Sequence, residues 1–154
     1  MLKARFAAAL ALLTAATGVT LAAGSPAQAA APALQFTKIQ YDSPGSDNRS
    51  NASLNAEYVR IMNKTTHNVS MTGWTVRDRS AHVYTFGTYT LGPGRSVYVH
   101  TGKGTNGRPA AADRYWGSGA YIWNNGGDAA TLRDAANRTV DSCSWGTGAA
   151  TTNC

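Results

Sequence analysis

The amino-acid sequence predicts an all-β protein whose strands pack as a β-sandwich or close as a barrel. Short segments in which apolar and polar residues alternate recur along most of the chain. Clusters of Gly, Pro and Asn, which favour turns, separate these segments at short intervals. After residue 29, no segment has apolar residues at helical spacing between helix caps. These three observations favour short strands joined by turns.

The first 29 residues have the pattern of a secretory signal peptide. Residues 1–5 are a short basic start, residues 6–23 are almost wholly apolar or small, and Ala27-Gln28-Ala29 places small side chains before a cleavage site. A single membrane anchor is the alternative, but the apolar run is only just long enough to cross a bilayer. We expect cleavage after Ala29, secretion, and no membrane insertion of the cleaved protein.

Residues 30–154 have the size of one domain. Removal of residues 1–29 leaves 125 of the 154 residues, enough to bury a modest core. Because Lys3 and Arg5 leave with the signal, 12 of the 14 basic residues remain beside 8 acidic ones, and the net charge is +4. The basic residues are scattered, which favours a solvated surface over a nucleic-acid site. We expect a monomer with no specific nucleic-acid partner.

Eight segments are predicted to be strands from their alternation and flanking turn residues. In chain order they are residues 34–41, 57–63, 69–71, 73–78, 82–86, 96–100, 129–134 and 139–144. In the second of them, Val59 and Ile61 alternate with Arg60. Tyr58 and Met62 fall on the same polar side as Arg60.

The connections between these strands carry turn signals. Gly73 suggests a bend or bulge within its segment. Pro93-Gly94 turns the chain into the strand at residues 96–100. Polar loops are predicted for residues 42–55 and 102–114, and the second is the least structured part of the chain after the signal peptide.

The two cysteines of the chain, Cys143 and Cys154, are predicted to form a disulfide. In an exported protein an isolated pair is read as one bridge. This bridge would close a loop of about a dozen residues, worth about 3 kcal/mol in the chain-entropy model. A metal or redox site would need closer spacing or nearby histidines. In the final strand, Val140 and Ser142 share one side and Cys143 lies on the other.

Residues 124–128, Asn-Asn-Gly-Gly-Asp, are interpreted as a turn rather than as a binding site. Asn, Asp and Gly tolerate left-handed backbone angles, and Asn and Asp side chains satisfy turn amides. We expect Gly127 to adopt a backbone angle that a side chain would strain. We expect the Asp128 carboxylate to accept hydrogen bonds from turn amides. Both residues are then architectural.

Four motifs occur in the order and spacing of one family. They are Glu57-Tyr58-Val59, Gly73-Trp74, Leu91-x-Pro93-Gly94 and Trp123-Asn124-x-x-Gly127-Asp128-x-Ala130-x-Leu132. Together they resemble the lamin tail domain, and the chain looks like the exported bacterial branch of that family from about Ile39 to Trp145. The resemblance implies an immunoglobulin-like β-sandwich and no shared catalytic residues. It also implies a tethering or interaction role, since members of this branch are often attached to secreted hydrolases.

The residues needed for common catalytic sites are not present in the expected patterns. His67, His82 and His100 are the only histidines, and none has a second histidine at metal-site spacing. The chain has no Gly-x-Ser-x-Gly motif, and the segment at residues 102–105 lacks the first glycine and the hydroxyl residue of a phosphate loop. We expect no catalytic residue, no metal and no cofactor.

The polar loop leaves calcium binding open. Enough oxygen atoms for a calcium site are carried by Asp42, Asp47, Asn48, Asn51 and Glu57. Their spacing is not that of an EF-hand, and a solvated loop in which Asp and Asn form turns accounts for the same residues.

An aromatic segment supplies the candidate ligand-binding residues, Tyr115, Trp116 and Tyr121. Exposed Tyr and Trp side chains stack on sugar rings or form the centre of a protein interface. The alternative is that aromatic residues fill the core, which we expect of Trp74 and Trp123.

The sequence therefore predicts a secreted, non-catalytic binding or structural module. Its expected partner is an extracellular protein or an envelope polysaccharide. The alternative is a protein that binds carbohydrate or a cell-wall polymer through its Tyr and Trp side chains, and a small secreted hydrolase is a distant third.

Overall fold

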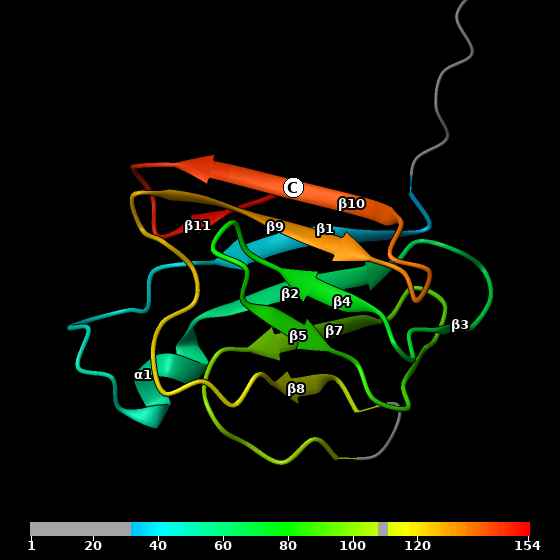
Figure 1. Ribbon diagram of the computed structural model, residues 1–154, viewed down its shortest axis with the longest axis horizontal. Coiled ribbons are helices and arrows are strands. Elements are labelled where there is room, and N and C mark those ends of the chain that lie inside the picture. The colour runs from blue at the N-terminus through cyan, green and yellow to red at the C-terminus, as the bar shows by residue number, and fades with distance from the viewer. Residues whose placement is uncertain (1–31, 108–110) are drawn as a thin grey trace, which may run out of the picture. The chain divides into compact units, whose positions relative to one another are not determined.

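The computed structural model describes residues 32–107 and 111–154, and in this part of the chain two β-sheets lie one over the other (Figure 1). The strands are β1 (Leu34–Gln40), β2 (Tyr58–Asn63), β3 (Val69–Ser70), β4 (Thr75–Arg77), β5 (Val83–Thr85), β6 (Thr90–Leu91), β7 (Ser96–His100), β8 (Asp113–Tyr115), β9 (Gly127–Arg133), β10 (Thr139–Gly146) and β11 (Thr151–Thr152). The predicted signal peptide, residues 1–29, lies outside the described residues.

The first sheet has five strands in the order β11-β1-β2-β7-β8, and the second has four in the order β10-β9-β4-β5. Strands β3 and β6 form a separate pair. Within the described residues, every pairing is antiparallel except that of β7 with β8. The all-β prediction is confirmed.

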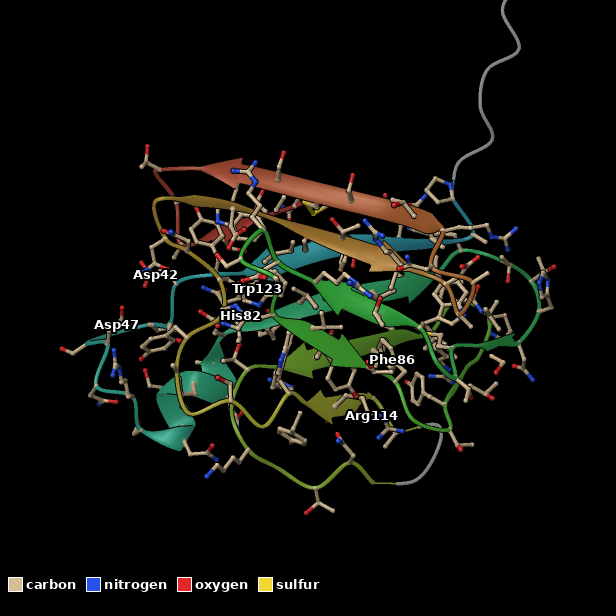
Figure 2. The ribbon with its side chains drawn as sticks, in the orientation of Figure 1. Asp42, Asp47, His82, Phe86, Arg114 and Trp123 are labelled. Carbon is tan, nitrogen blue, oxygen red and sulfur yellow. A yellow bond between two sulfur atoms is a disulfide. The ribbon has the colours of Figure 1, made fainter. Side chains whose placement is uncertain are left out.

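The inward faces of the two sheets meet in one hydrophobic core. Strand alternation places Val59 and Ile61 of β2 inside, opposite residues such as Leu132 of β9 in the other sheet. Trp123, labelled in Figure 2, is buried in this core, as expected. Trp74 is only partly buried and packs against the core from its margin.

The loop predicted for residues 42–55 contains a short helix, α1 (Asn51–Ala56), so the prediction that this segment has no helix was wrong. The Ser50 side chain caps the helix by accepting a hydrogen bond from the Ser53 amide. Leu54 is its one buried residue. A helix of six residues with one apolar contact has no hydrophobic period to detect, and its stability comes from docking.

Two further strand predictions are corrected by the structure. The loop predicted for residues 102–114 contains β8, which pairs in parallel with β7 over only three residues. In β10, the register with β9 shifts between Thr139 and Asp141. This bulge breaks the simple alternation, because it leaves Val140 partly buried while Cys143 and Trp145 face the core beyond it.

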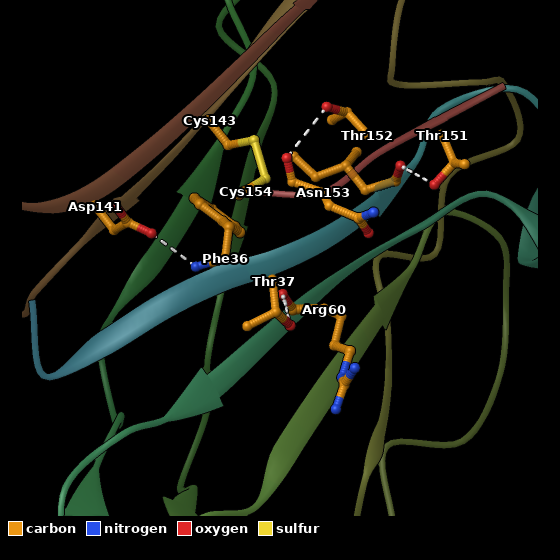
Figure 3. Close-up of a disulfide and its surroundings, with 10 residues drawn as sticks. Phe36, Thr37, Arg60, Asp141, Cys143, Thr151, Thr152, Asn153 and Cys154 are labelled. Carbon is orange, nitrogen blue, oxygen red and sulfur yellow. Dashed lines mark hydrogen bonds between the residues drawn. A yellow bond between two sulfur atoms is a disulfide. The ribbon is translucent and has the colours of Figure 1, made fainter. Parts of the chain in front are cut away.

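The predicted bridge between Cys143 and Cys154 is formed (Figure 3). It joins the two sheets, because Cys143 belongs to β10 of the second sheet and Cys154 follows β11 of the first. In β11, Thr152 pairs with Ile39 of β1, and the Thr151 hydroxyl donates to the Ile39 carbonyl at 3.0 Å. The C-terminal tail is therefore a structural strand.

The 124–128 segment is a turn whose polar groups are used internally. The buried Asp128 carboxylate accepts hydrogen bonds from the amides of Arg79 and Ala129 through Oδ1 and from the Asn124 amide through Oδ2. Gly127 has φ +127°, and a Cβ there would lie 3.1 Å from the Trp145 carbonyl oxygen. Both residues have the geometry expected of architectural turn residues.

We predict that Gly127→Val lowers the free energy of unfolding by roughly 1–3 kcal/mol, since the backbone angle strains any side chain. Asp128→Ala should cost about 1–3 kcal/mol, because buried amides lose their acceptor. Gly146→Val is the matched control, as its Cβ would meet open space without a positive φ. Thermal unfolding measures all three, and equal melting temperatures for the two glycine variants would contradict the interpretation of Gly127.

For the disulfide, we predict that the native protein gains the mass of two hydrogen atoms only after reduction. The double variant Cys143→Ser/Cys154→Ser should be less stable by about 3 kcal/mol, because the unfolded chain loses a short covalent loop. Intact-mass analysis and chemical denaturation test the two statements separately. Two free thiols in the native protein would disprove the first.

Candidate functional site

The three predicted ligand-binding residues do not form one platform. The Trp116 ring is half-buried and contacts the Tyr84 and Trp123 rings, each at 5.8 Å between centroids. The Tyr121 hydroxyl forms a 2.7 Å hydrogen bond with the Ser53 hydroxyl of α1. Tyr115 ends β8, and within the described residues no ring contact joins any two of the three. Of the three, Tyr115 lies on the outward face of a sheet.

That outward face belongs to the five-stranded sheet and is produced by strand alternation. In β2, Val59 and Ile61 are buried, so Tyr58 and Arg60 point to the other side. β7 and β8 follow the same rule: they bury Val97, Val99 and Arg114 and turn Tyr98, His100, Asp113 and Tyr115 outward.

A bulge in β1 completes the arrangement. The register with β2 shifts between Phe36 and Lys38, and beyond the shift Lys38 lies opposite Arg60 and Gln40 opposite Tyr58. Two rows of side chains then run across four strands: Lys38, Arg60, Tyr98 and Asp113 in one, and Gln40, Tyr58, His100 and Tyr115 in the other. We call these eight residues the tyrosine face.

Four aromatic rings of the tyrosine face form one continuous cluster. The Tyr58 ring lies 5.5 Å from the Tyr98 ring and 5.7 Å from the His100 ring, between centroids. The Tyr115 and His100 rings stack with centroids 5.3 Å apart. Among the described residues, the hydroxyls of Tyr58, Tyr98 and Tyr115 have no hydrogen-bond partner, whereas the Tyr121 hydroxyl has one.

The two cations of the face lie over its tyrosines. Lys38 Nζ is 5.9 Å from the centroid of the Tyr58 ring, and Arg60 Cζ is 5.8 Å from that of Tyr98. Arg60 Nε also donates to the Ser96 hydroxyl at 3.1 Å. Neither cation forms an ion pair with a carboxylate in residues 32–107 and 111–154.

The single carboxylate of the face is held by its histidine. His100 Nε2 lies 3.0 Å from Asp113 Oδ1, and Nδ1 lies 2.7 Å from the Asn55 carbonyl oxygen at the end of α1. Asp113 is therefore directed toward His100 on β7. Its carboxylate does not neutralise the charges of Lys38 and Arg60, which lie on β1 and β2.

A buried carboxyl group lies directly behind the second row. Glu57, which precedes Tyr58, is fully buried, and its Oε1 accepts hydrogen bonds from the Thr101 hydroxyl and from the amides of Ile122 and Trp123. Its Oε2 has no hydrogen-bond partner among the described residues. Burial raises the pKa of Glu57 from 4.5 to about 7.

Three of the five residues considered for a calcium site use their side-chain oxygens in hydrogen bonds within the protein. Asn48 accepts the Ser50 amide, Asn51 accepts the Lys103 amide, and Glu57 is bonded as above. Asp42 and Asp47 both come from the connection between β1 and α1 (Figure 2). In the part of the chain that the structure describes, no group of three His, Cys, Asp or Glu residues is placed to hold a metal ion.

The histidines give no support to a catalytic reading. His82 Nδ1 lies 2.6 Å from the buried carboxylate of Asp78, and His100 belongs to the tyrosine face. Among the described residues, no imidazole ring is hydrogen-bonded to a Ser, Thr or Cys side chain.

The described residues also include no helix that is long and apolar enough to span a membrane.

Sequence reasoning missed most of the tyrosine face. The alternation of residues 57–63 placed Tyr58 and Arg60 on the polar side of their strand, and the same signal in residues 96–100 could have placed Tyr98 and His100 on the outward side of theirs. What it lacked was the pairing of β2 with β7 and the bulge in β1, which bring residues from four strands together.

We predict that Glu57 makes the folded protein less stable as pH rises. Its pKa is about 7 when folded and near 4.5 when unfolded, so between these values only the folded state keeps the proton. The free energy of unfolding should fall by about 3 kcal/mol from pH 4.5 to above pH 7 and then level off. Glu57→Gln, which mimics the protonated acid, should remove this component.

Chemical denaturation at pH 5 and pH 8 measures the effect as the difference between wild type and Glu57→Gln. Asp42→Asn is the control, since it neutralises an acid on the connection between β1 and α1 without removing the Asp47 charge that helps to raise the pKa of Glu57. An identical pH dependence in wild type and Glu57→Gln would show that the carboxyl group is ionised without cost.

Comparison with known proteins identifies the family. The model of the Lamin Tail Domain family matches residues 27–147, which include both sheets except β11 and all four motifs noted in the sequence. No curated protein matches the chain. This non-enzymatic family has an immunoglobulin-like β-sandwich, which agrees with the two sheets observed. The chain therefore belongs to the lamin tail domain family.

Proposed function

We propose that this chain is a secreted, non-catalytic module that binds an extracellular partner on the tyrosine face. Secretion is supported by the signal-peptide pattern of residues 1–29 and by the disulfide between Cys143 and Cys154, since such bridges persist in oxidising compartments. Membership of a family without catalytic residues supports the binding role. We place the chain in the exported bacterial branch and expect it to act as a monomer.

The observation that carries the proposal is the composition of the tyrosine face. Three tyrosines with unused hydroxyls and two unpaired cations lie side by side on one sheet. Tyr and Arg are the residue types that most often dominate binding energy, because they combine apolar area with a polar group. Cross-strand aromatic pairs also stabilise a sheet, so binding and stability have to be measured on the same variants.

A second candidate function is the binding of carbohydrate or a cell-wall polymer. Tyr115 supports it, because this residue joins Tyr58 and Tyr98 in one aromatic cluster through His100. Trp116 and Tyr121, which were grouped with Tyr115 from the sequence, contact the core margin and α1 instead. We therefore place the candidate carbohydrate-binding surface on the tyrosine face of the sheet rather than on the connection at residues 115–121.

The test is capture of envelope material on the immobilised mature protein. Intact cells and an envelope fraction from the producing organism are incubated with wild type, with Tyr98→Ser and with Val83→Ser. Tyr98→Ser should reduce capture about tenfold, as expected for a central aromatic contact. Val83→Ser, which removes an exposed apolar side chain from the other sheet, should not.

Analysis of the captured material separates the candidates. Protein that is retained supports an interaction module, and polysaccharide supports the second candidate. Equal capture by the three proteins, all with native melting temperatures, would remove the tyrosine face from the function. Turnover of the captured material would contradict the non-catalytic role.

A further inference from the structure

We infer that the ligand of the tyrosine face is an acidic polysaccharide, whose carboxylates contact Lys38 and Arg60 and whose sugar rings lie over the tyrosines. The inference rests on the proposed function and names its ligand class. Three observations support it: the unpaired charges of Lys38 and Arg60, the strand register that places them opposite each other, and the polar and aromatic groups of the two rows of the tyrosine face.

The first row contains a like-charge pair that the protein does not neutralise. Lys38 and Arg60 are directly opposite in the β1–β2 register. Like charges in such a pair destabilise a sheet, and a fold without a ligand gains by placing an acidic residue beside them. None of the described carboxylates pairs with either. A carboxylate from a ligand would relieve this repulsion and form charge-assisted hydrogen bonds to both.

The same row gives the ligand a direction. Its other end carries Asp113 on β8, two strands away from Arg60. A negative group is attracted at the β1–β2 end and repelled at the β8 end. The ligand should therefore bear its carboxylates on the side that lies over β1 and β2.

The second row contains no Lys, Arg, Asp or Glu and suits the body of a sugar chain. The Gln40 amide nitrogen donates to the carbonyls of Asp42 and Ala150, so this residue offers only its amide oxygen. Tyr58 and Tyr115 offer hydroxyls that have no hydrogen-bond partner among the described residues. Such groups exchange hydrogen bonds with sugar hydroxyls, while the aromatic rings contact the apolar faces of the sugars.

A third cation extends the surface beyond the first row. The Ser96 hydroxyl that accepts from Arg60 also lines a cavity of about 500 Å³, together with Asn68, Leu91 and Arg95. Arg95 is exposed and forms no ion pair among the described residues. Arg95 therefore shares this cavity with the residue that accepts from Arg60, and it offers a third cation to an extended polymer.

Other polyanions fit the face less well. Nucleic acid carries a charge at every nucleotide and is bound by cations along its whole length, whereas the second row has no Lys or Arg. An anionic membrane surface attracts clusters of about four to eight basic residues. A polymer with carboxylates on one side and hydroxyls on the other matches the two rows.

The experiment uses calorimetry to measure binding of hyaluronate and gellan, acidic polysaccharides in which carboxylate-bearing sugars are separated by neutral ones, to the mature protein. The carboxyl-reduced form of each polymer is the matched neutral ligand. Wild type should bind the acidic polymers and not the reduced ones. Lys38→Gln/Arg60→Gln should bind about tenfold more weakly, because two charge-assisted contacts are lost. Tyr98→Phe should weaken binding about fivefold, as expected for one hydroxyl hydrogen bond.

The control is Arg77→Gln/Arg79→Gln, which removes the same charge from the strand β4 and the turn after it on the other sheet. Like Arg60, Arg77 donates to a hydroxyl, that of Thr75, so the two arginine changes are matched. The affinity of the control variant for the acidic polymers should stay within about twofold of wild type, since screened charges far from a ligand contribute little. Equal losses in both double variants would mean that net charge alone binds the polymer and would overturn the inference.

Further outcomes separate this inference from the proposed function. Equal binding of acidic and reduced polymers, or equally tight binding of single-stranded DNA, would overturn the acidic-polysaccharide assignment. If neither acidic polymer binds while capture of envelope material still depends on Tyr98, the ligand class is wrong and the proposed function stands. If Tyr98→Ser also leaves capture unchanged, both are wrong.

Discussion

The buried carboxyl group of Glu57 connects three segments that are far apart in the sequence. It lies at the junction of α1 and β2, takes the hydroxyl of Thr101 at the end of β7, and accepts the amides of Ile122 and Trp123. Those amides belong to a connection outside any strand, so no sheet partner satisfies them, and buried amides need an acceptor. One carboxylate therefore organises this end of the sandwich, and its burial raises its pKa.

The same two central strands serve the core and the surface. In β2 and β7, the residues that face inward fill the hydrophobic core, and their neighbours form the middle of the tyrosine face. Glu57 precedes Tyr58 and bonds to Thr101, which follows His100. The hydrogen bond between Thr101 and Glu57 therefore links the residues next to Tyr58 and His100 and supports the second row of the tyrosine face. A rigid support of this kind lowers the entropy that a ligand must overcome to order its binding surface.

The C-terminal tail adds a second constraint. Without β11, the edge of β1 would expose unpaired backbone groups, which invite association with other chains. The tail covers that edge at Ile39 and Gln40, and the bridge between Cys143 and Cys154 keeps it there by joining it to the other sheet. The bulge in β1 that positions Lys38 lies on this supported strand. An oxidising environment, in which such a bridge persists, would therefore favour both the fold and the proposed binding surface.

The sequence by itself determined the all-β class, the disulfide partners and the turn geometry of Gly127 and Asp128, because alternation, cysteine count and turn chemistry are local properties. It also revealed the family through motifs carried by core and turn residues such as Trp123. Only the tertiary structure decided the helix at residues 51–56, the parallel strand β8 and the position of Tyr115. These depend on long-range contacts: α1 docks through one buried leucine, and β8 needs β7 beside it. The tyrosine face likewise exists only after β1, β2, β7 and β8 have paired in register, since each strand contributes two of its residues.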